Sequence, residues 1–384
     1  MKYDYGKIHE LVTRAYLDAR RQERKTQAQL SFEVALEEGI ASLSRDLSRR
    51  TWRPGPMRWF VLEQPTIREV FAPSFRDRVV SHVLFNLISP IFERYFIYDS
   101  FSCRKEKGTL FGIERFEHHI RSVSDNYRRE AWCLNIDISG YFMSINRERL
   151  YKIIQRTLGK HREAFPGEVD YEFVDYLIRS YLYRDPTIDC VFVGKPKLVR
   201  LVPPGKSLFS QPEGTGIPIG DVGNQLNSNI YLNELDQFVK RELKARHYCR
   251  YVDDCRIIRD DYYALERDKE RIQEFLQNEL LLTLHPDKTC IKSVYDVNLF
   301  LGAAIRPWRK LARAETLKKF RGYIRHLEKS SGFSPEEELP RLNSHLGYLA
   351  HFDEYREVKK TLDSAPAVLS KYKFDNNYSK ALIK

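Results

Sequence analysis

The chain has 384 residues, and at about 100–200 residues per domain this length corresponds to two or three packed units. Hydrophobic residues make up 42% and aromatic residues 13% of the sequence, which is enough apolar material for a sizeable core and excludes wholesale disorder. The 64 Lys and Arg residues outnumber the 53 Asp and Glu residues and leave a net charge of +11, so the expected partner is a polyanion, either nucleic acid or an acidic membrane surface.

Several features favour nucleic acid over a membrane. No segment approaches the run of about 18 apolar residues that a membrane-spanning helix needs, and the N-terminus lacks the apolar stretch of a secretion signal. The cysteines are scattered, with no Cys-x-x-Cys pair and no Cys/His cluster at zinc spacing. We therefore expect free thiols in a reducing cytoplasm, and no membrane partner.

The periodicity of apolar residues and the positions of Pro and Gly predict the secondary structure. In chain order we expect helices over most of 1–50, strand character at 59–70, an apolar helix at 77–98, a basic loop at 102–110, a buried strand at 132–138, helices at 147–158 and 171–182, a hairpin at 190–202, a loop at 203–216, a helix at 221–243, paired strands at 248–258, a helix at 265–281, short strands near 289 and 300, a basic helix at 315–329 and a helical tail. Strands that alternate with helices favour an α/β or α+β core.

The positive charge is concentrated near the C-terminus. Between Arg306 and Lys329, nine basic and two acidic residues give +7 in 24 residues. Within this segment Leu317, Phe320, Ile324 and Leu327 recur at a helical period. The sequence therefore predicts a helix that buries one stripe and exposes basic side chains on its other face, namely Lys318, Lys319, Arg321 and Arg325.

Three carboxylates are the most informative residues. Asp137 stands near the end of an apolar strand, where a charge is costly unless it is paired or binds a metal. Asp253 and Asp254 lie between two β-prone runs without Gly or Pro. A double Asp in a turn is common on protein surfaces, but its combination with a buried strand that ends in Asp137 favours a metal site. Three convergent carboxylates can hold two Mg²⁺ ions about 3.5–4 Å apart for in-line phosphoryl transfer.

Around these carboxylates the sequence resembles the reverse transcriptases. The resemblance rests on short motifs that occur in the family's order: Asp77-Arg-Val-Val, Ser102-Cys-Arg-Lys-Glu-Lys-Gly-Thr, Asp137-Ile-Ser-Gly-Tyr-Phe-Met-Ser-Ile, Gly216-Ile-Pro-Ile-Gly-Asp-Val-Gly-Asn-Gln, Tyr251-Val-Asp-Asp, Leu284-His-Pro-Asp-Lys, Phe300-Leu-Gly and Ser344-His-Leu-Gly-Tyr-Leu-Ala-His. The match extends from about residue 30 to 360, and an ordered set of motifs is far more specific than any one of them.

Within the family, the sequence is most similar to prokaryotic enzymes of diversity-generating retroelements and to the related "unknown group" enzymes of antiphage defence. It has Asn224-Gln225 where the diversity-generating enzymes usually carry Ser-Gln, and its segment 186–216 is longer than expected for that group. Both departures favour a defence-type relative.

The resemblance implies an α+β right-hand polymerase with fingers, a ferredoxin-like βαββαβ palm and a helical thumb. The expected division is an N-terminal helical region at 1–60, fingers at 61–130, a palm at 131–305 with an insertion near 186–216, and a thumb with a helical tail at 306–384.

By the same resemblance, Asp137, Asp253 and Asp254 are catalytic ligands of two Mg²⁺ ions, for which Mn²⁺ is a candidate substitute, and Lys288 is a general acid near the leaving pyrophosphate. Further residues are expected at the dNTP. Phe142 is expected as a steric gate against the ribose 2′-hydroxyl, and Ile219 occupies a position linked to fidelity. Contacts with the triphosphate or the templating nucleotide are expected from Arg68, Arg78 and Gln225. The structural alternatives are a core aromatic for Phe142, an ion pair for Arg78 and a surface lysine for Lys288.

Contacts with the nucleic-acid backbone are expected from Lys105 and Lys107 of the basic loop and from Lys318, Lys319, Arg321 and Arg325 of the thumb helix. The implied activity is RNA-directed DNA synthesis from dNTPs on a noncoding RNA template, which forms an RNA–DNA duplex and serves antiphage defence. Mutagenic retrohoming, template-independent synthesis and a nucleic-acid-binding protein without catalysis are the alternatives. Accessory proteins and a second copy of the chain are further candidate partners, and the sequence leaves the primer open.

Overall fold

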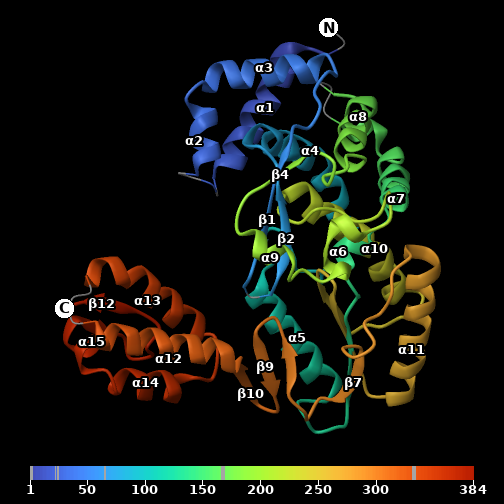
Figure 1. Ribbon diagram of the computed structural model, residues 1–384. Coiled ribbons are helices and arrows are strands. Elements are labelled where there is room, and N and C mark those ends of the chain that lie inside the picture. Colours follow the sequence, from blue (N-terminus) through green and yellow to red (C-terminus); the bar gives the residue numbers. More distant parts are fainter. Residues whose placement is uncertain (1–2, 22, 24–25, 65, 166–168, 331–333) are drawn as a thin grey trace.

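The computed structural model describes residues 3–384, except residues 22, 24–25, 65, 166–168 and 331–333. Figure 1 shows N-terminal helices at one end, sheets and helices in the middle, and a helical lobe at the side formed by the C-terminal part of the chain. Among the described residues, no helix is both long enough and apolar enough to cross a membrane.

The N-terminal helices pack on a long apolar helix, α4. In chain order these helices are α1 (Tyr5–Arg20), α2 (Gln27–Glu33), α3 (Leu36–Ser48) and α4 (Phe75–Glu93). The side chains of Asp4 and Thr26 accept hydrogen bonds from backbone N–H groups in the first turns of α1 and α2, which caps both helices. Since α1 packs against both α3 and α4, the N-terminal helices form one unit with the helix that leads into the centre of the molecule.

A small sheet, here called the hairpin sheet, follows the N-terminal helices. Its strands are β1 (Met57–Leu62), β2 (Arg68–Ala72) and β4 (Cys190–Phe192), in the order β2-β1-β4. The single stretch of strand character predicted at 59–70 is therefore an antiparallel pair, with Leu62 opposite Arg68.

The hairpin predicted at 190–202 is wrong. Instead, β4 pairs in parallel with β1, with Cys190 opposite Met57, and Pro196 then begins the short helix α9 (Pro196–Val199). Proline suits the first position of a helix, and the abundance of valine in this segment obscured that signal. The loop expected at 203–216 contains two 3₁₀ turns, Pro204–Lys206 and Leu208–Ser210.

The central sheet has four antiparallel strands in the order β5-β6-β3-β7. They are β3 (Trp132–Ile136), β5 (Tyr248–Tyr251), β6 (Asp254–Arg259) and β7 (Cys290–Ser293). The connecting helices are α6 (Tyr141–Ser144), α7 (Arg147–Gly159), a 3₁₀ turn (Arg162–Ala164), α8 (Tyr171–Leu182), α10 (Val222–Arg241), α11 (Tyr262–Phe275) and a π-helical turn (Leu276–Leu280). Strand order and connections match a βαββαβ core, so the predicted α+β class and ferredoxin-like core are confirmed.

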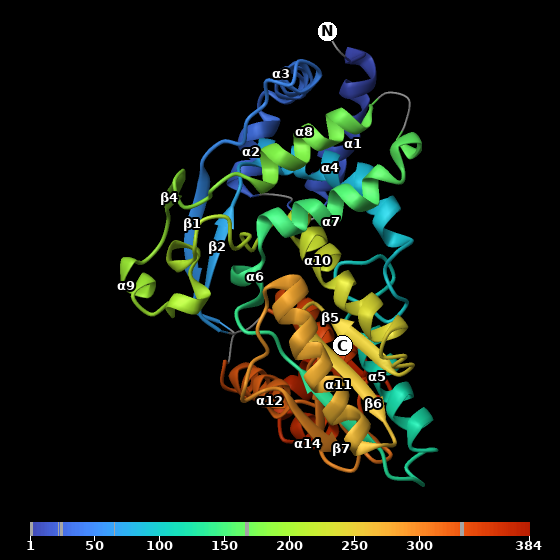
Figure 2. The same ribbon diagram turned by 90° about the vertical axis from the view of Figure 1, so that its right-hand side faces the viewer.

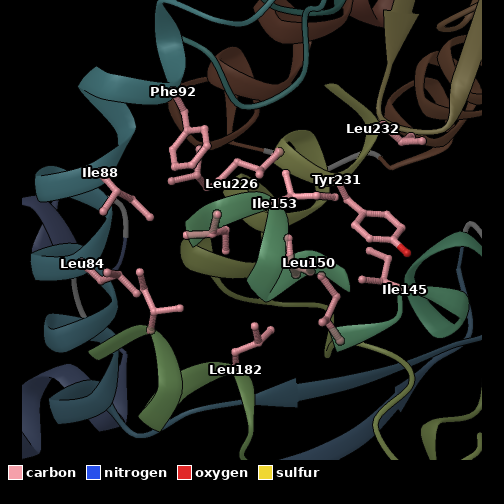
Figure 3. Packing of buried hydrophobic residues seen from close by; sticks show 14 of the residues in the cluster. Leu84, Ile88, Phe92, Ile145, Leu150, Ile153, Leu182, Leu226, Tyr231 and Leu232 are labelled. Atoms are coloured by element: carbon pink, nitrogen blue, oxygen red, sulfur yellow. The ribbon is translucent and has the colours of Figure 1, made fainter. Parts of the chain in front are cut away.

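The largest hydrophobic core lies between α4, α7 and α10. Figure 3 shows Ile88 and Phe92 of α4 near Leu226 of α10 and Ile153 of α7. Helix α10 is buried on nearly every side and carries buried polar side chains as well, among them Asn229 and Asp236. Because buried polar groups need partners, α10 is a framework for the hydrogen bonds described below.

A second core joins the C-terminal lobe to the central sheet. A small sheet of β8 (Asn298–Phe300), β9 (Ala303–Arg306) and β10 (Arg309–Ala312) leads into the lobe. The lobe itself contains α12 (Ala314–Lys329), α13 (Pro335–Leu349), α14 (Tyr355–Asp363), α15 (Pro366–Lys371), β11 (Tyr372–Phe374) and β12 (Ala381–Ile383). Phe116 of α5 (Thr109–Val123) and Phe300 belong to the same buried cluster as Phe320 of α12. The predicted helical tail ends in a β11–β12 hairpin, whose three-residue strands are too short to give a clear alternation.

Candidate active site

The carboxylates predicted to act together come from two segments that meet at one end of the central sheet. Ile136 of β3 pairs with Cys255 of β6, so the next residue, Asp137, comes opposite Asp254. Tyr251 pairs with Asp254 across β5 and β6, which leaves Val252 and Asp253 as the two residues of a tight turn. The sheet register therefore brings Asp137 beside the turn that carries Asp253.

The turn at Val252 and Asp253 is strained, and the buried cation Arg250 stabilises it. Val252 has φ of 56°, a left-handed conformation that β-branched residues rarely adopt. The Arg250 guanidinium donates a hydrogen bond of 3.0 Å to the Val252 carbonyl oxygen and two bonds of 2.7 and 2.8 Å to the Asp236 carboxylate. Tyr248 donates a further bond to Asp236, and both members of the Arg250–Asp236 ion pair are fully buried. The network thus fixes the backbone next to Asp253.

Asp253 and Asp254 lie in surroundings that disfavour their ionisation. Burial, together with the charges of Asp137 and Asp254, raises the pKa of Asp253 to about 6. Burial also raises the pKa of Asp254; the charge and hydrogen bond of Arg256 offset part of this effect, and the charge of Asp137 adds a smaller increase. A site with surplus negative charge of this kind favours a cation.

Two side-chain cations already contact these carboxylates. The Lys288 Nζ lies 3.2 and 3.4 Å from the two carboxylate oxygens of Asp137, and Arg256 forms an ion pair with Asp254. Within the described part of the chain, no three His, Cys, Asp or Glu side chains lie close enough together to hold a metal ion. The donor set still suits a hard cation, because all three groups offer carboxylate oxygens.

Phe142 and Ile219 lie on two segments that backbone hydrogen bonds connect. Phe142 belongs to α6, is partly buried, and accepts a hydrogen bond of 2.9 Å from the backbone N–H of Ile217 through its carbonyl oxygen. Ile219 packs on a small cluster that includes Phe71, and its carbonyl oxygen accepts a bond of 3.3 Å from the Phe71 N–H. The loop 216–220 thereby ties α6 to the hairpin sheet, and the core and gate interpretations of Phe142 both remain compatible with its half-buried ring.

The two predicted arginines lie in different surroundings. Arg68 is exposed at the start of β2 and donates a bond of 3.0 Å to the Thr66 hydroxyl. Arg78 forms an ion pair with Glu23, which follows α1. Both members of that pair line a cavity of about 460 Å³, which also receives Asp221 and Gln225 at the start of α10. Arg78 therefore forms an ion pair, which was the structural alternative to its predicted role at the dNTP.

Three further predicted residues lie in the basic loop before α5 and at the start of α10. Gln225 is exposed and its side-chain oxygen accepts a bond of 3.3 Å from the Cys103 thiol. Lys105 is exposed. Lys107 is committed to a local contact, because its Nζ donates to the Tyr98 carbonyl oxygen and lies 4.1 Å from the centre of the Tyr98 ring.

The predicted basic helix exists as α12, and its basic residues divide into two groups. Lys318, Lys319 and Arg325 are exposed. Arg321 is exposed as well, but its guanidinium lies 3.9 Å from the Glu357 carboxylate of α14. The face available to a polyanion is therefore carried by Lys318, Lys319 and Arg325, with Arg321 at its edge beside α14.

The residues that hold the site in shape were not found from the sequence. Arg250 and Asp236 form a buried pair, Arg256 pairs with Asp254, and Glu69 is buried beneath the hairpin sheet. The pairing of Arg256 with Asp254 could have been predicted from the sequence, since residues two apart on a strand share a face. The signal for Arg250 was its position as a charged residue in an apolar strand.

Comparisons with known proteins agree with the motifs. A family model described as reverse transcriptase (RNA-dependent DNA polymerase) matches residues 63–305. Protein YkfC of Escherichia coli (strain K12) is 24% identical over 310 residues, which cover 72% of each chain.

Solved structures with a similar fold include two telomerases. One is from Candida albicans in complex with a fragment of telomeric RNA, with 12% identity, a TM-score of 0.48, and coverage of 88% of this chain and 60% of that one. The other is apo telomerase from Candida tropicalis, with 12% identity, a TM-score of 0.47, and coverage of 82% and 62%. The chain thus spans about 60% of the telomerase chains that it matches.

Proposed function

The chain belongs to the reverse transcriptase family and is an RNA-directed DNA polymerase of the right-hand, α+β class, and we propose that Asp137, Asp253 and Asp254 form its metal-binding catalytic centre. The observation that carries the proposal is the meeting of these carboxylates at the end of the central sheet, where burial and mutual repulsion raise the pKa of Asp253 to about 6. Two Mg²⁺ ions, or Mn²⁺ in their place, would supply charge neutralisation for in-line attack of a primer hydroxyl on the α-phosphate.

Lys288 is the proposed proton donor. Its Nζ lies 3.2 Å from Asp137, so it stands at the edge of the same centre. If Asp137 held a metal, the ammonium group of Lys288 could approach a phosphate oxygen, where it would neutralise charge on the leaving pyrophosphate or protonate it. Arg256 would release Asp254 in the same way.

The nucleotide would lie over α6. A half-buried phenyl ring at Phe142 is suited to exclude a 2′-hydroxyl, which favours dNTPs over ribonucleotides. Arg68 is exposed and free of carboxylate partners among the described residues, so it is the arginine better placed to bind phosphate; Arg78 would first have to leave Glu23. Gln225 at the start of α10 would contact the templating nucleotide. The side chain of Ile219 cannot donate a hydrogen bond, and the proposed consequence is low fidelity of nucleotide incorporation.

The nucleic acid would lie between the site and the C-terminal lobe, which we assign as the thumb. Lys318, Lys319 and Arg325 offer an exposed cationic face on α12, with Arg321 at its edge. Lysines at such a face hold backbone phosphates without reading sequence. Lys105 is a further candidate contact with the template, whereas the commitment of Lys107 to Tyr98 argues for a structural role.

The proposed template is a noncoding RNA encoded near the gene, and the proposed role is antiphage defence. Both rest on the resemblance to the "unknown group" enzymes and on the departures at Asn224-Gln225 and in the long segment 186–216. The principal alternative is mutagenic retrohoming by a diversity-generating retroelement. A template-independent polymerase is the second, because some defence relatives add nucleotides without a template.

Primer extension separates these possibilities. The purified chain is supplied with an RNA template, a primer and Mg²⁺, and single dNTPs are supplied with and without RNA. RNA-dependent products that disappear on chelation of Mg²⁺ support the proposal, whereas equal products without RNA indicate template-independent synthesis. Sequencing of the RNA and cDNA that copurify with the protein then identifies template and primer. Recovery of a complementary cDNA with frequent errors would favour retrohoming.

A further inference from the structure

The segment 186–216, here called the insertion, is fastened to the loop that follows Asp137. The carbonyl oxygen of Gly205 would lie only 2.8 Å from a side-chain carbon at Gly140, so a residue with a Cβ at this position would collide with the insertion. Gly140 also has φ of 54°, which favours glycine for a second reason. The insertion therefore approaches the segment between Asp137 and Phe142 at backbone distance.

A buried carboxylate holds the same turn from the other side. The Glu69 carboxylate accepts bonds of 2.8 Å from the Ser207 hydroxyl and 2.9 Å from the Leu208 backbone N–H. Glu69, Ser207 and Leu208 are all buried. Gln211 donates from its side chain to the carbonyl oxygens of Pro204 and Ser207, at 3.0 and 2.8 Å. The turn is thus rigidly placed between β2 and the loop of the catalytic Asp137.

The residue at the centre of this rigid turn is Lys206. It is exposed, it follows Gly205 and precedes Ser207, and within the described residues it has no carboxylate partner. Among the described residues, the turn therefore presents a positive charge without a carboxylate partner, one residue from the contact between Gly205 and the segment that joins Asp137 to Phe142.

We propose that Lys206 binds the phosphates of the incoming dNTP, as a cation that the insertion adds to the nucleotide pocket. The inference rests on the proposed function, in which the segment from Asp137 to Phe142 lies beneath the nucleotide. A lysine on a flexible four-carbon stem, rooted one residue from the Gly205–Gly140 contact, can reach a triphosphate lying over that segment. A rigid turn reduces the entropy lost when the contact forms.

The test compares Lys206→Gln, Lys206→Arg and the parent chain in primer extension on poly(rA)/oligo(dT) with dTTP. Lys197→Gln is the matched control, because Lys197 is an exposed lysine on α9 in the same insertion, well away from α6 in Figure 2. Loss of one charge-assisted phosphate contact should raise the KM for dTTP about tenfold in Lys206→Gln. Lys206→Arg should stay within about threefold of the parent, and Lys197→Gln should match it.

A second measurement removes the chemical step. With a dideoxy-terminated primer, dTTP retention in the ternary complex should weaken by the same factor in Lys206→Gln, while the Kd for template–primer stays unchanged. Equal KM values in the two Gln variants, or a change confined to template–primer binding, would overturn the inference. Absence of extension by the parent chain, with dTTP retention still dependent on Lys206, would instead contradict the proposed function alone.

Discussion

Replacement of Arg250 by Met tests whether a buried ion pair supports the turn of Asp253. The guanidinium makes two hydrogen bonds of 2.7 and 2.8 Å to Asp236, and both side chains are fully buried. Removal of Arg250 leaves a buried carboxylate for which, among the described residues, Tyr248 is the remaining side-chain donor. Breaking one side of a buried pair costs about 3–5 kcal/mol, so we expect the free energy of unfolding to fall by about that amount.

The matched control is Arg179→Met. Arg179 pairs with Asp175 at 2.9 Å, but its side chain is 56% exposed, and exposed pairs contribute about 0–1 kcal/mol. Equilibrium unfolding in urea, followed by circular dichroism, measures both variants. Comparable losses in the two variants would refute the assignment of a structural role to the buried pair.

A double variant separates stability from positioning. In Arg250→Met/Asp236→Leu neither charge is left alone, so most of the lost stability should return. Primer extension should remain impaired, because the Val252 carbonyl oxygen still lacks its donor and the strained turn is no longer held. Recovery of extension together with stability would show that Arg250 has no positioning role.

Four further predictions follow from the same structure. Burial raises the pKa of Asp221 to about 6, so the free energy of unfolding should fall by about 1–3 kcal/mol as the pH rises from about 4 to 6 and the carboxyl ionises. Asp221→Asn should remove this pH dependence in urea unfolding, and an unchanged pH profile would contradict the prediction. Phe142→Ala should increase ribonucleotide incorporation at least about tenfold in single-nucleotide extension, and unaltered selectivity would indicate a core role. Lys318→Glu/Lys319→Glu should weaken duplex binding and reduce its salt dependence more than Arg321→Glu, since Arg321 is partly committed to Glu357; an unchanged salt slope would exclude the thumb contact. Ile219→Gln should lower misincorporation in sequenced products, and an error rate equal to that of the parent would refute the link to fidelity.

Elements with a strong local pattern were predictable from the sequence. The apolar period of α12, the uninterrupted strand that ends before Asp137 and the paired strands around Tyr251 all appear where expected. The parallel pairing of β4 with β1 was not predictable, because it joins Cys190 to Met57, and no local periodicity encodes a contact between such distant segments.

The proximity of the candidate site residues was predictable in part, but the contacts that support them were not. The order of motifs placed Lys288 and Asp137 in one centre, and the structure has them 3.2 Å apart. The ion pair between Arg78 and Glu23 depends on how α1 lies against α4, which only tertiary packing determines. The same holds for Glu69 and the insertion, since a buried carboxylate gives no signal until its partners Ser207 and Leu208 are placed.

The most direct test of the catalytic centre is the rate of Mg²⁺-dependent primer extension on an RNA template by Asp253→Asn. The control is Asp260→Asn, because Asp260 is an exposed aspartate just past the other end of β6. Metal-assisted charge stabilisation contributes several kcal/mol to such reactions, so Asp253→Asn should slow extension at least about 10³-fold while Asp260→Asn matches the parent. Extension by Asp253→Asn at the rate of the control would contradict the assignment of the centre.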